Sequence, residues 1–225
     1  MINGKKVLAI TLARGGSKRV PKKNIADING KPLIQYTFDE VKKSKYIDQY
    51  IVSTDDIDIM GVCIENNVQS IIRPKNLAED TTTSADALVH CVEEQGKYDY
   101  VVEIMCTNPL KVVEDIDSVI EKIDETNADS VVSVVRIWDH HPSRVKYIEN
   151  GKLIDFYPEI PESRRQDLSP AAYVRNGSIY ATTYESLITN KVRLGPDTRP
   201  HIMPEERTIN IDEPIDLELA RIVLR

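Results

Sequence analysis

Short apolar runs alternate with helical stripes of apolar residues along most of the chain. Residues 6–12 form an apolar run rich in branched side chains, which is typical of a parallel strand buried on both faces. Similar runs lie at residues 50–53, 68–72, 99–105 and 130–135. Between them, apolar residues recur three and four positions apart, which predicts helices around Ile34, Ile59, Ala85 and Ile116. The alternation predicts β–α–β units and a doubly wound, mostly parallel α/β sheet.

The pattern changes over residues 138–172, which we expect to form an inserted β-rich arm. This span contains Trp138 and the hairpin sequence Asn150-Gly151. Strand-like runs resume at residues 173–182 and 208–211. A last helix is expected after Pro214, with one face formed by Ile215, Leu219, Ile222 and Val223. Because no repeat or low-complexity linker interrupts the chain, residues 1–225 are expected to form a single domain that carries this arm.

Composition excludes several classes of protein. With 41% hydrophobic and 29% charged residues, the 225-residue chain is expected to be globular. It has no apolar run of the roughly 20 residues that a membrane-spanning helix needs, and no secretory signal is expected. Three scattered cysteines favour a reducing, cytoplasmic location. A net charge of −7 disfavours general binding to nucleic acid or to acidic membranes.

A basic loop at residues 14–24, with the sequence RGGSKRVPKKN, departs from this acidic average. It contains five cationic residues and no acidic one. It follows the first expected strand, and open α/β sheets bind ligands beyond the carboxyl ends of their strands. Gly15 and Gly16 would let backbone amides approach a ligand, and Arg14, Lys18 and Lys23 could surround a triphosphate. The alternative is a solvated basic loop without a ligand.

This loop resembles the signature of the CMP-acylneuraminate synthetases, nucleotidyltransferases that activate sugars. The resemblance covers almost the whole chain, and its further motifs are INGKPLIQYT (28–37), VSTDD (52–56), RPKNLAEDTTTS (73–84), TNPL (107–110), RRQDL (164–168), RNGSIYAT (175–182) and INIDEPIDLELA (209–220). It implies a Rossmann-like nucleotidyltransferase fold. It also implies a homodimer formed through the arm at residues 138–172.

The resemblance assigns the nucleotide-binding residues. Arg14 and Lys23 would hold the triphosphate and stabilise charge as the α-phosphate is attacked, which makes them the expected catalytic residues. Ser17 and Lys18 would contact phosphate. The positions that would surround the cytosine and the ribose are Asn24, Arg73, Thr82 and Ser84. Two alternatives remain open: Arg73 could be a surface arginine, and Ser84 could be a helix N-cap, a role that is compatible with binding.

The resemblance also assigns a site for the acceptor sugar. Arg165, Arg175 and Asn176 match acceptor positions of the family, whose acceptors are α-keto acids. Guanidinium groups suit a carboxylate, although the two arginines could instead form surface ion pairs. Arg165 lies in the arm and could therefore act on the partner's site. Met105 stands where sialate-activating members often have a glutamine that touches the sugar, so it either marks a different sugar or only ends a strand.

A magnesium site is implied at residues 210–212. Asp212 matches a Mg²⁺-binding aspartate of the family, and Asn210 stands where another aspartate is usual. Alternate positions of a strand share one face, so Asn210 could offer a neutral oxygen. Asp212 could instead cap the helix that follows Pro214.

The resulting hypothesis is a cytoplasmic, Mg²⁺-dependent cytidylyltransferase. It would transfer CMP from CTP to a nonulosonic, sialic-acid-like keto sugar acid and release pyrophosphate, for use in surface-glycan synthesis. Two alternatives remain. One is an enzyme of the same fold that uses another nucleotide or a sugar 1-phosphate. The other is a non-catalytic nucleotide-binding protein, which the asparagine at position 210 makes conceivable.

Overall fold

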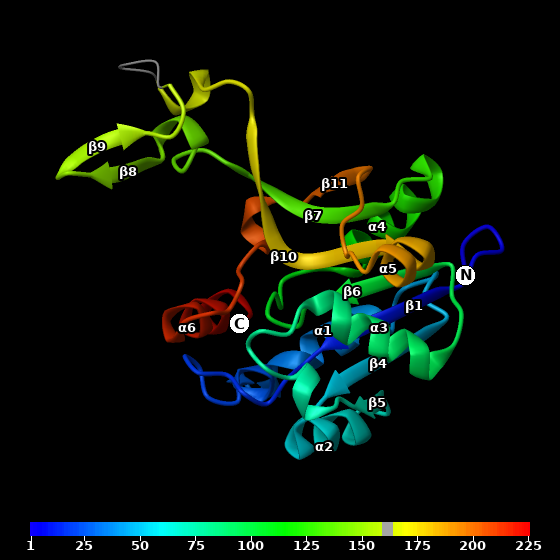
Figure 1. Cartoon of the computed structure of the whole chain (residues 1–225). Helices are drawn as coiled ribbons and strands as arrows, with labels where there is room; N and C mark the ends of the chain where they lie inside the picture. The colour runs from blue at the N-terminus through cyan, green and yellow to red at the C-terminus, as the bar shows by residue number, and fades with distance from the viewer. Residues whose placement is uncertain (159–163) are drawn as a thin grey trace.

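A seven-stranded sheet forms the centre of the computed structural model, which describes residues 1–158 and 164–225 (Figure 1). The strand order is β11-β7-β10-β6-β1-β4-β5. The strands are β1 (Val7–Leu12), β4 (Gln49–Thr54), β5 (Gln69–Ile72), β6 (Tyr100–Ile104), β7 (Ser130–Ile137), β10 (Ala172–Thr183) and β11 (Thr198–Ile202). Only β10 runs antiparallel to its neighbours, so the expected mostly parallel sheet is confirmed.

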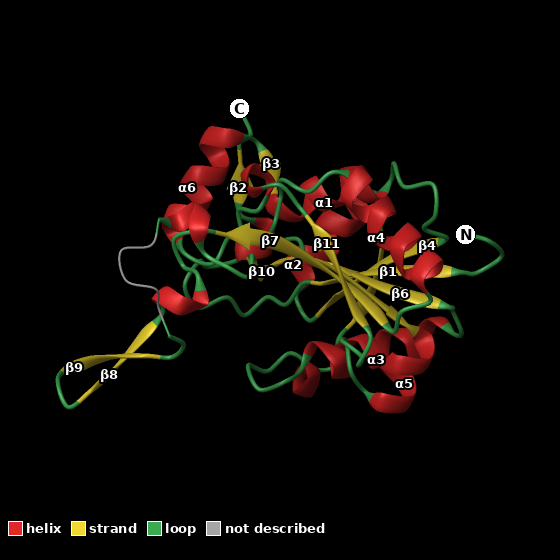
Figure 2. Cartoon of the chain, turned by 90° about the horizontal axis from the view of Figure 1, so that it is seen from above, coloured by secondary structure: helices red, strands yellow, loops and turns green. Residues whose placement is uncertain are grey.

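Helices cover both faces of the sheet. They are α1 (Leu33–Val41), α2 (Ile57–Glu65), α3 (Ser84–Gln95), α4 (Val113–Thr126), α5 (Tyr184–Asn190) and α6 (Pro214–Val223). Figure 2 shows α3 and α5 on one face and α1 and α4 on the other. Along β1, Val7 and Ala9 pack toward α4, whereas Leu8 and Ile10 pack toward α3. A strand buried on both faces explains the apolar run in the sequence.

Shorter elements complete the described chain. Five 3₁₀ helices lie at η1 (Lys23–Ile25), η2 (Lys75–Leu77), η3 (Pro142–Arg144), η4 (Arg165–Asp167) and η5 (Glu205–Arg207), and β2 (Asp27–Ile28) pairs with β3 (Lys31–Pro32). No helix of the described residues is both long and apolar enough to cross a membrane.

Two expectations for the carboxyl-terminal third were wrong. Residues 208–211 form no strand; their apolar side chains pack beside α6, and the Ile211 N–H donates to the Thr107 carbonyl at 2.8 Å. The edge strand β11 was missed, because Pro200 at its centre lacks an N–H donor. Proline is tolerated in sheets mainly on such an edge strand, where one side of the backbone has no partner.

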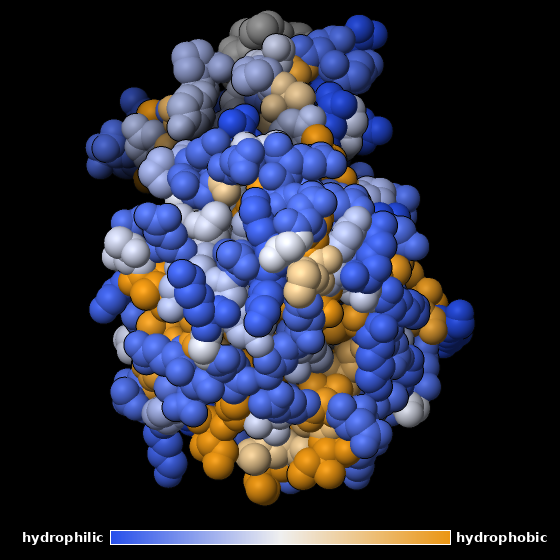
Figure 3. Space-filling view, turned by 90° about the vertical axis from the view of Figure 1, so that its right-hand side faces the viewer, coloured by the Kyte–Doolittle hydropathy of each residue, from blue (hydrophilic) through white to orange (hydrophobic). Residues whose placement is uncertain are grey.

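Helix α6 also buries a different face from the one expected. Leu217 and Ala220 pack into the core, whereas the predicted apolar face is 46–71% exposed at Ile215, Leu219, Ile222 and Val223. Hydrophobic surface is also visible in Figure 3 at the lower end of the molecule, where α2 and β5 lie. Large apolar side chains are exposed there at Ile57, Ile64 and Ile72.

The expected arm contains a hairpin that projects from the rest of the molecule (Figure 1). Strands β8 (Lys146–Glu149) and β9 (Lys152–Asp155) pair in antiparallel fashion. Asn150 and Gly151 connect them with φ angles of 51° and 75°, the left-handed geometry that a two-residue turn of this kind requires. The hairpin prediction is therefore confirmed. Residues 159–163 of the expected arm lie outside the described residues.

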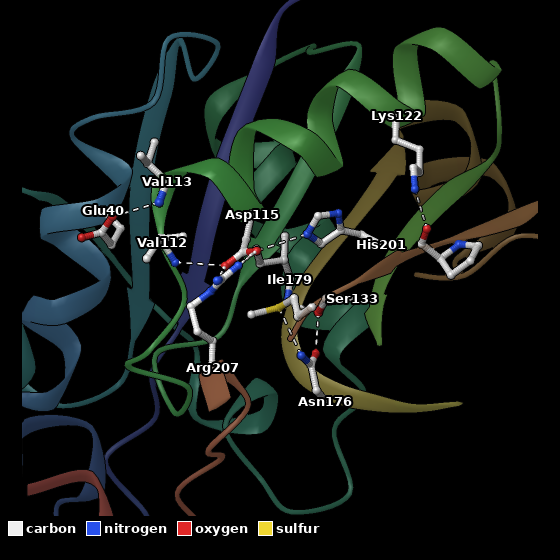
Figure 4. A network of polar contacts seen from close by, with 12 residues as sticks. Glu40, Val112, Val113, Asp115, Lys122, Ser133, Asn176, Ile179, His201 and Arg207 are labelled. Atoms are coloured by element: carbon white, nitrogen blue, oxygen red, sulfur yellow. Dashed lines mark hydrogen bonds and ion pairs between the residues drawn. The ribbon is translucent and has the colours of Figure 1, made fainter. Parts of the chain in front are cut away.

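A buried carboxylate ties the first turn of α4 to β11 and η5 (Figure 4). Asp115 accepts hydrogen bonds from Arg207 at 2.7 and 3.2 Å and from the Val112 N–H at 3.1 Å. The Nε2 atom of His201 lies 3.3 Å from the same group. Burial by itself raises the pKa of Asp115, but these hydrogen bonds outweigh it and lower the pKa to about 2. The ionised carboxylate is therefore a stabilising feature above pH 4.

Replacing this carboxylate tests its contribution. Asp115→Asn should lower the free energy of unfolding at pH 7 by about 2 kcal/mol, the equivalent of the pKa shift. Because the folded-state pKa of Asp115 lies below that of the unfolded chain, the wild-type protein should lose this stability as the pH falls from about 4 toward 2. The free energy of unfolding of the variant should depend less on pH in this range. Urea denaturation between pH 7 and 3 measures both effects. Glu125→Gln, on the exposed face of α4, is the matched control and should change little.

Candidate active site

A cavity of about 350 Å³ opens at the carboxyl end of the central strands. Most of its wall comes from the basic loop, and the rest comes from the ends of β1 and β6 and from the segment before α6. Its lining residues are Leu12, Arg14, Ser17, Lys18, Arg19, Val20, Lys23, Asn24, Met105, Thr107 and Asp212. The fold thus brings together three motifs that are far apart in the sequence, at the edge where such sheets bind ligands.

The basic loop is held against the end of β4. The N–H of Gly15 donates to a carboxylate oxygen of Asp55 at 2.9 Å. A Cβ atom at position 15 would come within 2.8 Å of the Asp56 Cβ, so only glycine fits there without displacement. Asn24 is buried and donates to the carbonyl of Arg14 at 2.9 Å, which closes the loop from its other side. The loop is therefore shaped by contacts rather than being free in solvent.

Acidic residues from elsewhere in the chain pair with the loop cations. Asp80 pairs with both Arg14, at 2.8 Å, and Lys18, and hydrogen bonds from these two cations lower the pKa of Asp80. Lys23 lies 2.9 Å from Asp212 and donates to the carbonyl of Ile211 at 2.8 Å. Two cations that converge on one carboxylate can equally converge on a phosphate group.

A second cavity, of about 220 Å³, adjoins the first along Leu12, Arg14 and Met105. It contains three of the four residues assigned to the nucleoside, Arg73, Thr82 and Ser84, whereas Asn24 lines the first cavity. Arg73 is buried and donates to Ser53 Oγ at 3.0 Å and to the Ser53 carbonyl at 2.7 Å, so it is not a surface arginine. The N-cap of α3 is Thr83, not Ser84, which is the first residue of the helix.

A third cavity, of about 420 Å³, holds two of the residues assigned to the acceptor. Its lining residues are Val135, Val174, Arg175, Asn176, Gly177, Tyr180, Arg193, Thr208 and Asn210. Asn176 is fixed by Ser133, whose hydroxyl donates to its amide oxygen at 2.7 Å (Figure 4). Arg165 does not line this cavity; it is exposed on η4, 3.7 Å from Asp139. The structure therefore brings Arg175 and Asn176 together, but not Arg165.

Asp212 and Asn210 join the first cavity to the third. The Asn210 amide nitrogen donates to Asp212 at 2.6 Å, while its amide oxygen is buried without a hydrogen-bond partner among the described residues. The N-cap of α6 is Glu213, so the alternative that Asp212 caps this helix is wrong. No cluster of three or more His, Cys, Asp or Glu side chains within residues 1–158 and 164–225 could hold a metal ion. Asp212 is the one acidic residue among the described residues that line the first cavity.

Lys111 supports the segment after β6 that contributes to the first cavity, and it was missed from the sequence. It is buried, and its ammonium group donates to the carbonyls of Met105 at 2.9 Å and Asn108 at 2.5 Å. Burial lowers the pKa of Lys111 to about 8. Its position directly after the TNPL motif was the available signal, but nothing in the charge pattern marks it as buried. Cys106 is buried nearby with its pKa raised to about 11 by burial, which makes it a poor nucleophile.

Glu103 and Arg193 were also missed. Glu103 is buried on β6 and lines the second cavity, and it forms an ion pair with Arg193 of the third cavity at 2.5 Å. The position of Glu103 in the interior of the strand-like run 99–105, among apolar residues, was the signal that could have revealed the pair, because buried carboxylates need a partner. Arg193 follows α5 in a stretch without regular structure, so its spacing carries no signal.

Comparison with known proteins identifies relatives over nearly the whole chain. A sequence model of the family described as Cytidylyltransferase matches residues 8–188. The pseudaminic acid cytidylyltransferase of Campylobacter jejuni subsp. jejuni serotype O:23/36 is 30% identical over 226 residues, which cover 98% of this chain and 97% of that protein. The CMP-N,N'-diacetyllegionaminic acid synthase of Legionella pneumophila is 33% identical over 227 residues, covering 96% and 94%.

A solved structure confirms the expected fold. CMP:2-keto-3-deoxy-manno-octonic acid synthetase, complexed with CTP, matches with a TM-score of 0.76 at 21% sequence identity, over 97% of this chain and 98% of that chain. At this identity the likeness shows the shared fold alone. The sequence relatives, at 30% and 33% identity, show membership of a family in addition to a shared fold.

Proposed function

Because the chain belongs to the cytidylyltransferase family, we propose that it transfers CMP from CTP to a nonulosonic, sialic-acid-like keto sugar acid and releases pyrophosphate. The similar proteins of C. jejuni and L. pneumophila are named for pseudaminic acid and for a legionaminic acid, two sugar acids of this kind. Surface-glycan synthesis would consume the product. The free, buried cysteines are in keeping with a cytoplasmic location.

The arrangement of the cavities is the observation that carries this proposal. Arg14, Lys18 and Lys23 line one cavity, and Arg175 lines another. The hydrogen bond from Asn210 to Asp212 joins the two cavities at 2.6 Å. A triphosphate in the first and a sugar acid in the third would meet beside Asp212.

The proposed reaction makes one bond and breaks one. The anomeric hydroxyl oxygen of the sugar attacks the α-phosphorus of CTP, the bond from that phosphorus to the pyrophosphate oxygen breaks, and the hydroxyl proton passes to solvent. Such transfers depend on alignment and on neutralisation of charge, and they need no covalent bond to the protein. Arg14, Lys18 and Lys23 would neutralise the triphosphate. Its several charges would displace the single carboxylate of Asp80 from Arg14 and Lys18.

A nucleotide panel combined with a matched pair of lysine variants tests the proposal. Pyrophosphate release should require CTP together with a keto sugar acid, and Met105 leads us to expect a sugar other than N-acetylneuraminate. Lys23→Met should lower kcat/KM at least about 100-fold, because it removes a charge from the reacting phosphates. Lys22→Met should stay near wild type, because Lys22 pairs with Asp58 and does not line the cavity.

Three results would contradict the proposal. Equal rates with GTP or UTP would indicate a different nucleotide. Turnover of a sugar 1-phosphate would indicate a different acceptor class. Binding of CTP without pyrophosphate release for any keto sugar acid would indicate a non-catalytic nucleotide-binding protein.

We propose that Mg²⁺ is the metal cofactor and that Asp212 is its main protein ligand. The unpartnered oxygen of Asn210 and the carboxylate of Asp212 are hard oxygen donors that suit this ion. Mg²⁺ is commonly held by one or two carboxylates and by substrate phosphates, so a single aspartate is sufficient when CTP is present. When bound, the ion lowers the charge of the phosphate oxygens. Lys23 keeps the Asp212 carboxylate beside the loop.

Substitutions at these two positions test the metal assignment. Asp212→Asn should largely abolish turnover, because it removes the only carboxylate of the proposed site. Asn210→Asp should lower the Mg²⁺ concentration needed for half-maximal rate, because it adds a second carboxylate. Rates measured against Mg²⁺ concentration check both, and thermal melts confirm that each variant is folded. A fully active Asp212→Asn protein would refute the assignment.

We also propose that the arm at residues 138–172 forms a homodimer. A two-stranded hairpin alone is marginally stable. Strands β8 and β9 nevertheless expose Ile148 and Leu153, which pair on one face of the hairpin, and on its other face the rings of Tyr147 and Phe156 pack with their centres 5.1 Å apart. Exposed apolar side chains gathered in this way indicate an interface. In the dimer, Arg165 would be free to reach the acceptor cavity of the partner.

Sedimentation of two double variants tests the dimer. Ile148→Ser/Leu153→Ser should sediment as a monomer, because it removes apolar side chains that are 76% and 73% exposed. Ile57→Ser/Ile64→Ser on α2 is the matched control, since these residues are 76% and 71% exposed, and it should remain a dimer. A monomeric wild-type protein, or identical behaviour of the two variants, would contradict the proposal.

A further inference from the structure

The guanidinium group of Arg193 is held on two sides within the third cavity. Its Nη1 atom donates to the carboxylate of Glu103 at 2.5 Å. Its central carbon lies 3.8 Å from the centre of the Tyr180 ring, so a cation–π contact supports the group from another side. Glu103 and Tyr180 are both buried, whereas Arg193 is 22% exposed. A flexible side chain is thereby held in one place, with part of it open to the cavity.

Most of the hydrogen-bonding capacity of Arg193 is unused. A guanidinium group carries five N–H donors, and Arg193 makes only the bond to Glu103 among the described residues. Arg175, which lines the same cavity, is exposed and forms no ion pair with a described residue. No aspartate or glutamate is among the residues that line this cavity. The cavity therefore presents two arginines to a bound molecule, which suits a planar carboxylate.

The position of the pair links the acceptor to the nucleotide. Glu103 lines the second cavity and Arg193 the third, so the ion pair forms part of the wall between them. In a 2-keto sugar acid the carboxylate is bonded to the anomeric carbon. A group that fixes the carboxylate also fixes the attacking hydroxyl on that carbon, which must face the phosphates.

We infer that Arg193 binds the carboxylate of the acceptor together with Arg175, and that Glu103 and Tyr180 are positioning residues that hold Arg193 in place. The inference rests on the proposed function and deepens it. It supplies a second arginine from the same chain, whereas Arg165 lies outside the cavity.

The test compares a sugar acid acceptor with its methyl ester, which lacks the negative charge. The wild-type protein should prefer the acid in kcat/KM. In Arg193→Met the acid-to-ester ratio should fall about tenfold or more, because a hydrogen bond to a charged group is lost. The KM for CTP should stay within about twofold of wild type. Arg199→Met is the control: Arg199 pairs with Asp197, does not line the cavity, and should keep the wild-type ratio.

A merely structural ion pair gives a different result. If Arg193 only neutralises Glu103, Arg193→Met lowers the rates for acid and ester equally, and Glu103→Gln/Arg193→Met restores both. Either result overturns the inference. If Arg193→Met does not fold, the double variant can be measured instead, because Glu103→Gln removes the buried charge that would otherwise be unpaired. A lowered acid-to-ester ratio in the folded double variant supports the inference. A wild-type protein that releases no pyrophosphate with any acid or ester overturns the proposed function, and this inference with it.

Discussion

The ammonium group of Lys23 holds together the two distant parts of the chain that form the site. It reaches from the loop after β1 to the carbonyl of Ile211 at 2.8 Å and to the carboxylate of Asp212 at 2.9 Å. The segment around Asp212 is not paired in the sheet, so this contact, the bond from Ile211 to Thr107 and the packing of Ile209 and Ile211 beside α6 together hold it in place. Without them, the cavities that share this segment would lose a common wall.

Acidic residues from other parts of the chain balance the positive charge of the basic loop. The loop cations face Asp80, Asp58, Glu213 and Asp212, so an acidic protein can keep a dense basic loop folded in the absence of a ligand. Most of these partners are exposed and their ion pairs are weak in water. A multiply charged anion can replace them at small cost, whereas Arg193 would be costly to separate from Glu103, because the Glu103 carboxylate is buried.

The sequence determined the fold well where one physical signal dominated. Strands buried on both faces appear as apolar runs, and the Asn150-Gly151 turn specified the β8–β9 hairpin through its left-handed geometry. Prediction failed where tertiary contacts determine the local structure. The edge strand β11 was missed because it contains Pro200, and the alternating apolar residues before Pro214 led to a strand being predicted where none forms. In the site, the basic loop was evident, but Lys111 and Arg193 act through buried contacts that no spacing reveals.

Apart from Met105, the residues proposed to bind the sugar lie in the later half of the chain, whereas the residues proposed to bind the nucleotide lie in the first half. The first two cavities take their walls almost wholly from residues 12–107, whereas the third takes nearly all of its wall from residues 174–210. Evolution can therefore alter one recognition surface while leaving the other intact. A lineage of such proteins can diversify its repertoire of sugars by substitutions in the later half, and still draw on the same cellular nucleotide pool.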